Sequence, residues 1–325
     1  MSCTYRNSIF ETDDFYLTSL HCISVIQVPL HVLGTYIIIT KTPKKMEKVK
    51  YSMLFLHLWG AWMDLFVSIL SVPVFFFPIL SGYALGIMYY ILPTWIICYI
   101  GFASIGVLGS AIVMFFENRY NYLVRTDSET FSRKIKRFIH HVFNFSFSLL
   151  VLTPPFFHPQ EMPGFRETAQ HNASCLPATV IYNPRLYTLN TTSTLIVTVL
   201  SIYLVVIFSQ CIPFFVLTSR FVLKIRTVSN RTAHLQKQFF KALCIQISVP
   251  FLIVTIPTGY VFYVFYTGNL DVLLINGSAA WISTHGLFST IVMLRVHKPY
   301  RYALLEMIPC KKSAAKRFRL ATVSV

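Results

Sequence analysis

Seven long apolar stretches interrupt this chain, and they constrain its fold more than any other feature. Each is long enough to cross a hydrocarbon core of ~30 Å as an α-helix rising ~1.5 Å per residue. The stretches are Leu17–Thr40, Tyr51–Ile79, Met88–Phe116, Phe138–Phe157, Thr192–Ser219, Ala242–Leu270 and Val272–Leu294. Backbone groups in lipid must be satisfied within their own segment, and these stretches lack the alternation of barrel strands. The sequence therefore predicts an all-α membrane protein, a seven-transmembrane helix bundle.

The basic residues indicate how this bundle is oriented. Of the 28 Lys and Arg residues, all but Arg6, Arg166 and Arg185 lie in every second gap or in the tail. Cytoplasmic loops keep the positive excess, so we predict the N-terminus outside and the C-terminus inside. The predicted parts are an extracellular N-terminus (1–16), the bundle (17–294) and a cytoplasmic tail (295–325) with a short surface helix.

The composition agrees with a membrane protein and argues against a nucleic-acid partner. Hydrophobic residues make up 55% of the chain and charged residues only 12%, an unusual balance for a soluble domain. The net charge of +16 lies beside the membrane exits, where it faces anionic lipids. The lipid bilayer is therefore the expected partner of the basic residues, and no nucleic acid is expected.

Asp64 is the one charged residue inside the seven stretches. A carboxyl group near mid-membrane is costly unless it faces the bundle interior, so a functional role as a switch residue is predicted. The alternative is a protonated acid bonded to a neighbouring Ser or Thr. Catalytic and metal-binding motifs such as HExxH, GxSxG and paired Cys clusters are absent, so no enzyme, metal or cofactor is expected.

A short polar motif, Glu117-Asn118-Arg119-Tyr120, ends the third stretch. An Arg at this boundary either snorkels to the interface or acts as a switch that contacts a cytoplasmic partner. Its position resembles the Asp/Glu-Arg-Tyr of rhodopsin-like receptors, which also carry an Asp midway along helix 2, as Asp64 does here. Because Asn118 replaces the adjacent acid and Glu117 is two positions away, we expect Arg119 to be held less firmly.

A closer resemblance is carried by four motifs that occur in order near helix ends. They are Lys41-Thr42-Pro43-Lys44-Lys45-Met46, Leu56-His57-x-Trp59 with Asp64-Leu65, Phe116-Glu117-Asn118-Arg119, and His297-Lys298-Pro299-Tyr300-Arg301. Together they resemble the nematode serpentine chemoreceptors of class H, across nearly the whole chain. The resemblance implies a multi-pass chemosensory receptor in the plasma membrane of a sensory cilium, coupled to a heterotrimeric G protein.

The predicted outer halves of the helices indicate the class of ligand. They contain neither carboxylate nor Lys or Arg, so ion pairing from the helices is not available to a ligand. Aromatic residues are abundant, and a histidine in the seventh stretch offers an interior polar contact; the residues are Trp95, Tyr99, Tyr260, Tyr263, Trp281 and His285. We therefore expect a small, neutral or weakly polar ligand. Interfacial belts and helix packing are the alternative use of these aromatic residues.

Several covalent modifications are compatible with the predicted topology. Cys98 lies near the outer boundary and Cys175 in the long outer loop, so a disulfide between them is geometrically feasible; Cys3 is another partner for Cys175, and free thiols are the alternative. Asn172 and Asn190 begin glycosylation sequons in the same outer loop. Cys310, beside lysines after the last helix, is a palmitoylation candidate or an unmodified thiol.

A ligand-gated channel or a transporter is the alternative function. A transporter usually has several interior ionisable groups, whereas Asp64 stands alone within the stretches. A seven-helix channel of the insect odorant type places its N-terminus in the cytoplasm, contrary to the distribution of basic residues. The receptor is therefore the favoured interpretation.

Overall fold

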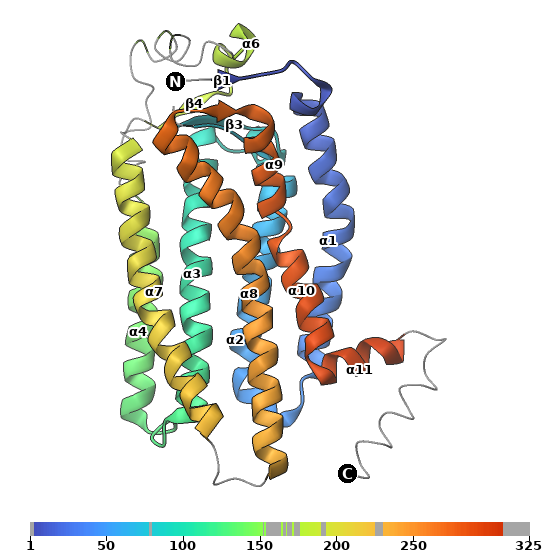
Figure 1. Cartoon of the computed structure of the whole chain (residues 1–325), viewed down its shortest axis with the longest axis vertical. Coiled ribbons are helices and arrows are strands. Elements are labelled where there is room, and N and C mark those ends of the chain that lie inside the picture. Colours follow the sequence, from blue (N-terminus) through green and yellow to red (C-terminus); the bar gives the residue numbers. More distant parts are fainter. Residues whose placement is uncertain are drawn as a thin grey trace.

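A helix is present at each of the seven apolar stretches. The computed structural model describes residues 3–77, 80–151, 153, 164, 167, 171, 176–189, 193–224 and 230–307. The helices are α1 (Asp13–Lys41), α2 (Glu47–Leu65), α3 (Thr94–Val124), α4 (Phe131–Val151), α7 (Ser193–Lys224), α8 (Asn230–Thr267), and the pair α9 (Val272–Ile282) and α10 (His285–Val296). They run side by side along the long axis (Figure 1), and α3 contacts α2, α4 and α7.

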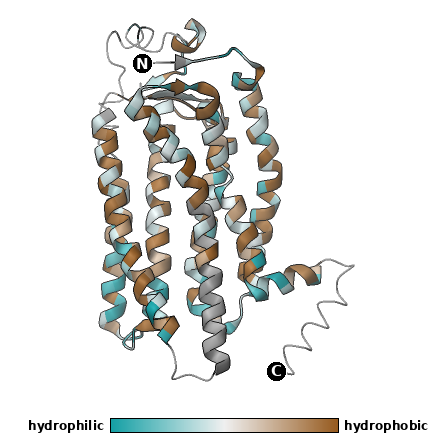
Figure 2. Ribbon diagram, viewed as in Figure 1, coloured by the Kyte–Doolittle hydropathy of each residue, from teal (hydrophilic) through white to brown (hydrophobic). Residues whose placement is uncertain are grey.

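The outside of this bundle is suited to lipid. Four of the described helices have the length and apolar composition to cross a membrane: Asp13–Lys41, Glu47–Leu70, Thr94–Val124 and Thr194–Lys224. Large apolar side chains such as Val25, Phe138 and Val205 are exposed on the surface of the bundle. Figure 2 shows hydrophobic residues along the middle of the helices and hydrophilic ones gathered towards the lower ends of α4 and α7. Such an apolar surface is expected against hydrocarbon rather than water.

The second apolar stretch is not helical to its end, which differs from the sequence prediction. After α2 a π-helical turn covers Phe66–Leu70, and the chain then forms strand β2 (Pro73–Phe76). The helix ends because Pro73 lacks the N–H that a continuing helix needs and Val72 adopts a left-handed φ of 42°. The third stretch also starts later than predicted, since α3 begins at Thr94, directly after Pro93.

Two small sheets lie at one end of the bundle, which is the predicted outer end (Figure 1). Strand β2 pairs antiparallel with β3 (Ser81–Ala84), and β3 pairs with β4 (Tyr187–Thr188). At the same end β1 (Cys3–Thr4) runs parallel to β5 (Leu270–Asp271). The three-stranded sheet contributes apolar side chains to the core between the helix ends, where Val74 and Tyr83 pack with Tyr16. This end of the bundle is therefore covered by strands, and one of them, β2, lies within a stretch that hydropathy predicts to be helical.

Polar contacts fix this cover to the helices. The Tyr83 hydroxyl lies 2.9 Å from each carboxylate oxygen of Asp13 and donates its one proton to this carboxylate, and the Tyr16 hydroxyl donates to the Pro73 carbonyl at 3.1 Å. Arg6 donates to Asp271 through Nη1 at 3.0 Å and through Nη2 at 2.6 Å. The N-terminal segment is thus tied to the start of α9.

At the opposite end, a short helix, α11 (Lys298–Met307), follows α10 and lies across the bundle axis (Figure 1). Its Tyr300 side chain is fully buried and packs with Met53 and Leu294. The Tyr300 hydroxyl is 2.9 Å from the Thr42 hydroxyl, so the end of α1 and the start of α11 are joined. This buried tyrosine sets the position of the surface helix.

Candidate functional site

The seventh membrane helix is broken between α9 and α10 because local side chains take up its backbone carbonyls. The Ser283 and Thr284 hydroxyls donate to the carbonyls of residues 280 and 281, and His285 Nδ1 lies 3.0 Å from the Ile282 carbonyl oxygen. Ser and Thr side chains commonly compete with the helix backbone in this way. The break leaves the first N–H groups of α10 without acceptors in their own helix.

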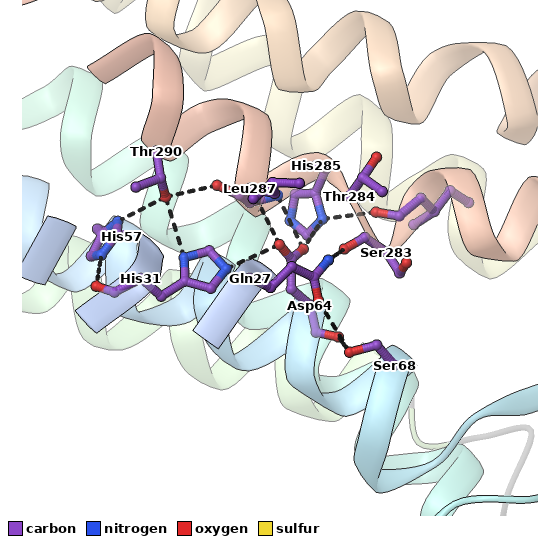
Figure 3. Close-up of polar contacts among 12 residues, drawn as sticks. Gln27, His31, His57, Asp64, Ser68, Ser283, Thr284, His285, Leu287 and Thr290 are labelled. Carbon is purple, nitrogen blue, oxygen red and sulfur yellow. Dashed lines mark hydrogen bonds and ion pairs between the residues drawn. The ribbon is translucent and has the colours of Figure 1, made fainter. Parts of the chain in front are cut away.

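Asp64 of α2 supplies those acceptors. Its Oδ1 accepts from the Gly286 N–H at 3.0 Å and its Oδ2 from the Leu287 N–H at 2.7 Å (Figure 3). The buried carboxylate therefore caps α10 from another helix, where the positive end of the α10 dipole favours a negative charge. This contact makes the position of α10 depend on Asp64.

Two histidines complete the surroundings of this carboxylate. His285 Nδ1 is 2.9 Å from Asp64 Oδ1, and His31 Nε2 of α1 is 3.1 Å from Asp64 Oδ2. Because His285 Nδ1 faces two acceptors, the carboxylate and the Ile282 carbonyl, it carries a proton and donates. Asp64 thus joins α1, α2 and α10 and serves as an acceptor, rather than as an acid bonded to a hydroxyl.

A second layer of polar side chains holds this cluster. Gln27 Nε2 donates to the Ser283 carbonyl at 2.7 Å, and the Ser68 hydroxyl is placed to donate to the carbonyl of Asp64 at 2.7 Å or to Gln27 Oε1 at 3.2 Å. The Thr290 hydroxyl oxygen of α10 lies 3.2 Å from His31 Nδ1 (Figure 3). Together these contacts form a buried polar network across the first, second and seventh membrane helices, which we call the Asp64 network.

Glycines allow the helices of the Asp64 network to approach closely. A Cβ on Gly286 would lie 2.7 Å from Asp64 Oδ2 and 2.8 Å from the Gly60 carbonyl. A Cβ on Gly34 would meet the His57 ring at 2.8 Å. Neither position accepts a larger side chain without movement of these groups. No group of three or more His, Cys, Asp and Glu side chains is placed to hold a metal ion in the described part of the chain.

At the inner end of α3, Glu117 faces α4 rather than Arg119. Its carboxylate accepts from Arg137 Nε at 2.9 Å and from Arg133 Nη2 at 3.0 Å, and all three side chains are mostly buried. Asn118 accepts from Arg137 Nη2 at 2.8 Å and donates to Ser52 at 2.9 Å. The polar residues beside Arg119 therefore fasten α3 to α2 and α4, as expected for residues that do not share its helix face.

Arg119 itself is buried and lies near the last motif of the chain. Its guanidinium is 5.8 Å from the centre of the Phe115 ring. Burial, and to a smaller extent the positive charge of Arg119, lowers the pKa of His297 to about 4. Burial raises the pKa of Tyr300, and the charge of Arg119 opposes that rise. Arg119 does not snorkel to the exterior here, and the motifs at the ends of the first, third and seventh helices meet at this point. Tyr120 turns away and packs against Phe214.

The predicted aromatic ligand residues separate into two groups. Trp95 and Tyr99 pack at the outer end against the buried side chains of Leu80, Tyr187, Leu189 and Ile196, and we call these six residues the outer cluster. Tyr260 packs against the core beneath the three-stranded sheet.

The other two aromatic residues point outward. Tyr263 and Trp281 each expose 51% of their surface, so they face the outside of the bundle, where the interfacial alternative applies. His285 lies in the Asp64 network and is not part of the outer cluster.

The sites of predicted modification stay predictions. Cys98 packs against the outer cluster and forms no disulfide with another described cysteine, whereas Cys175 lies outside the described residues. The sequons at Asn172 and Asn190 and the Cys310 thiol also lie outside the described residues.

The partners of Asp64 and Glu117 were not identified from the sequence. His31 and Gln27 are four residues apart, a spacing that places both on one face of α1. Arg133, Arg137 and His141 recur at intervals of four at the start of α4, a spacing that places them on one face. This spacing indicates a shared partner for the three side chains, but the two arginines also fit the general excess of Lys and Arg in an inner loop.

Comparison with known proteins gives these features a family context. A family model described as "Serpentine type 7TM GPCR chemoreceptor Srh" matches residues 11–310. The chain is 23% identical over 319 residues to "Serpentine receptor class H-72" of Caenorhabditis elegans, with 92% of this chain and 90% of the relative covered. These matches confirm the predicted fold class, an all-α protein of seven transmembrane helices, and the resemblance carried by the four motifs.

Proposed function

This chain belongs to the Srh family of serpentine seven-transmembrane chemoreceptors, receptors rather than enzymes, and from that premise we propose how it works. A small, neutral or weakly polar ligand binds in the outer half of the bundle, and the receptor then activates a heterotrimeric G protein inside the cell. The proposed location is the plasma membrane of a sensory cilium, with the N-terminus outside.

The outer cluster supports the position and class of the ligand. Trp95 and Tyr99 of α3 pack with Ile196 of α7 and with two residues at the end of the sheet, Tyr187 in strand β4 and Leu189 just after it. These side chains offer aromatic and aliphatic surface, which favours a mainly apolar molecule. The outer end is covered by strands fixed to the helices, so the ligand reaches the outer cluster by displacing or passing this cover.

The carboxylate cap on α10 is the observation that carries the signalling proposal. Helix α9 packs against β2 at the outer end, while α10 is held separately by Asp64 and leads to His297 and α11. A ligand that binds one packing of the outer half better than another therefore favours one position of α10 over another. The difference in the ligand's binding free energy between the two arrangements shifts the equilibrium between them.

The inner end supports coupling to a G protein. Arg119 of α3 is buried, and its charge is close enough to His297 to lower the pKa of that imidazole. Movement of α10 relocates His297 and Tyr300 and so changes the environment of Arg119. The basic residues of the inner loops, Lys224 among them, provide a positive surface for the partner.

The experiment is a screen of small volatile and water-soluble molecules on cells that express the receptor, with a calcium or cAMP readout. Each active molecule is tested again in cells that lack Gα subunits. The proposal expects the response to disappear without Gα. A ligand-evoked current that persists in those cells would instead establish the channel alternative.

A further inference from the structure

One polar group in the outer cluster, the Tyr187 hydroxyl, is buried and unpaired among the described residues. The Tyr187 side chain is 9% exposed, and its hydroxyl has no hydrogen-bond partner within the ranges that the structure describes. The ring lies among apolar side chains and beside Cys98, whose thiol is close enough to affect the phenol electrostatically. Buried hydroxyls are normally paired, so an unpaired one calls for an explanation.

The backbone around Tyr187 keeps this hydroxyl in place. Strand β4 pairs Tyr187 with Gly82 of β3, and the Leu189 N–H donates to the Leu80 carbonyl at 3.0 Å. A Cβ on Gly82 would lie 2.4 Å from the Val74 carbonyl oxygen, so the sheet has little freedom to shift at this point. The backbone of Tyr187 is therefore fixed by the sheet, and its ring is packed among the side chains of the outer cluster.

Leaving a buried hydroxyl unpaired opposes folding, because the group loses its hydrogen bonds to water without replacement. The same group becomes an advantage when a ligand supplies the missing acceptor. Tyr187 and Leu189 lie two residues apart on one face of the chain, and both contact the outer cluster that carries Trp95 and Tyr99. The unpaired hydroxyl is thus held at the place where the proposed function puts the ligand.

We propose that the Tyr187 hydroxyl donates a hydrogen bond to the ligand. The inference rests on the proposed function and specifies it: the ligand is a small neutral molecule with an apolar body and one accepting oxygen, as in a ketone, ester or ether. A charged ligand does not fit, because the outer cluster offers no countercharge and burial of a lone charge is costly. Tyr187 then determines which neutral molecules are recognised.

The first arm of the test needs no ligand. Tyr187→Phe removes only the hydroxyl, and the purified full-length receptor in nanodiscs should unfold at a Tm equal to or above that of the wild type. Tyr90→Phe, which alters a mostly exposed tyrosine at the same end, is the matched control and should leave Tm unchanged. A lower Tm for Tyr187→Phe alone would reveal a structural partner for the hydroxyl and overturn the proposal.

The second arm measures binding of defined probes through their concentration-dependent effect on Tm. Cyclohexanone, methyl hexanoate and dipropyl ether carry an accepting oxygen, cyclohexane lacks one, and hexylamine and hexanoic acid are charged. At least one accepting probe should stabilise the wild type, and Tyr187→Phe should bind that probe roughly three- to tenfold more weakly. Binding of cyclohexane should be unchanged by the substitution.

The outcomes separate this inference from the proposed function. If an accepting probe binds wild type and Tyr187→Phe equally, the role of Tyr187 is refuted while a neutral ligand in the outer half stands. If only hexylamine or hexanoic acid binds, the neutral-ligand proposal fails together with the inference. Absence of binding by all three accepting probes overturns the assigned ligand class.

Discussion

Replacing Asp64 by Asn tests the cap on α10 with almost no change of shape. The carboxylate accepts from Gly286 and His285 on Oδ1 and from Leu287 and His31 on Oδ2, at 2.7 to 3.1 Å. An amide keeps one accepting oxygen, and its NH₂ group then faces donors on the other side. One backbone N–H of α10 is left buried and unpaired whichever way the amide turns.

The size of the effect follows from that loss. A buried hydrogen bond to a charged acceptor contributes roughly 1.5–3 kcal/mol, and breaking a buried charge pair costs about 3–5 kcal/mol. We expect Asp64→Asn to destabilise the receptor by about 3 kcal/mol. If the acid were instead protonated and bonded to a hydroxyl, the amide would substitute for it at little cost.

The assay is thermal unfolding of the purified receptor in nanodiscs, with cell-surface expression and basal G-protein activity measured alongside. Asp14→Asn is the matched control, because Asp14 is exposed at the start of α1. Its effect should stay within a few tenths of a kcal/mol. A Tm for Asp64→Asn that equals the wild-type value, with unchanged basal activity, would refute the cap.

Three further predictions concern other contacts. Gly286→Ala should destabilise the protein by roughly 1–3 kcal/mol because the new Cβ would press on the buried Asp64 carboxylate. Gly277→Ala is the control, because the space at its Cβ is open, and it should cause no such loss. Equal Tm values for the two variants would contradict the close packing. Glu117→Gln should weaken the attachment of α4, costing about 2 kcal/mol because a hydrogen bond to a charged acceptor is lost, and should raise basal signalling. Unchanged stability and unchanged basal signalling would count against it. The hydrogen bonds from Arg6 lower the pKa of Asp271. Their contribution to docking of the N-terminal segment is therefore present above pH ~4 and is lost as the pH falls below it. Proteolysis of that segment should rise at acid pH in the wild type and be high at all pH values in Asp271→Asn.

The helices were predictable because long apolar runs have one solution in lipid, but the ends of those runs were not. Tyr51–Ile79 reads as one hydrophobic span, yet its last part is strand β2. A short buried strand and a buried helix have the same hydropathy, and the sequence signal that separated them here was proline, at Pro73 and Pro78. Likewise the break in the seventh helix depends on Ser283 and Thr284, which bond to carbonyls within their own turn.

The site was predictable in its central residue and not in its partners. Asp64 stood out because a carboxylate within a membrane span is expensive, which is a property of one position. His31 lies 33 positions away and α10 more than two hundred, so their contact with Asp64 depends on helix packing. Arg119 was identified by its place at a helix end, while the partners of Glu117 on α4 depended on how two helices face each other.

The orientation of the chain is the claim on which the ligand site, the outer cluster and the coupling surface all depend. It is tested most directly by attaching one epitope to the N-terminus and another to the C-terminus and staining intact and permeabilised cells. The account predicts that the N-terminal epitope is stained on intact cells and the C-terminal epitope only after permeabilisation. Staining of both epitopes under the same condition, or the reverse pattern, would contradict it.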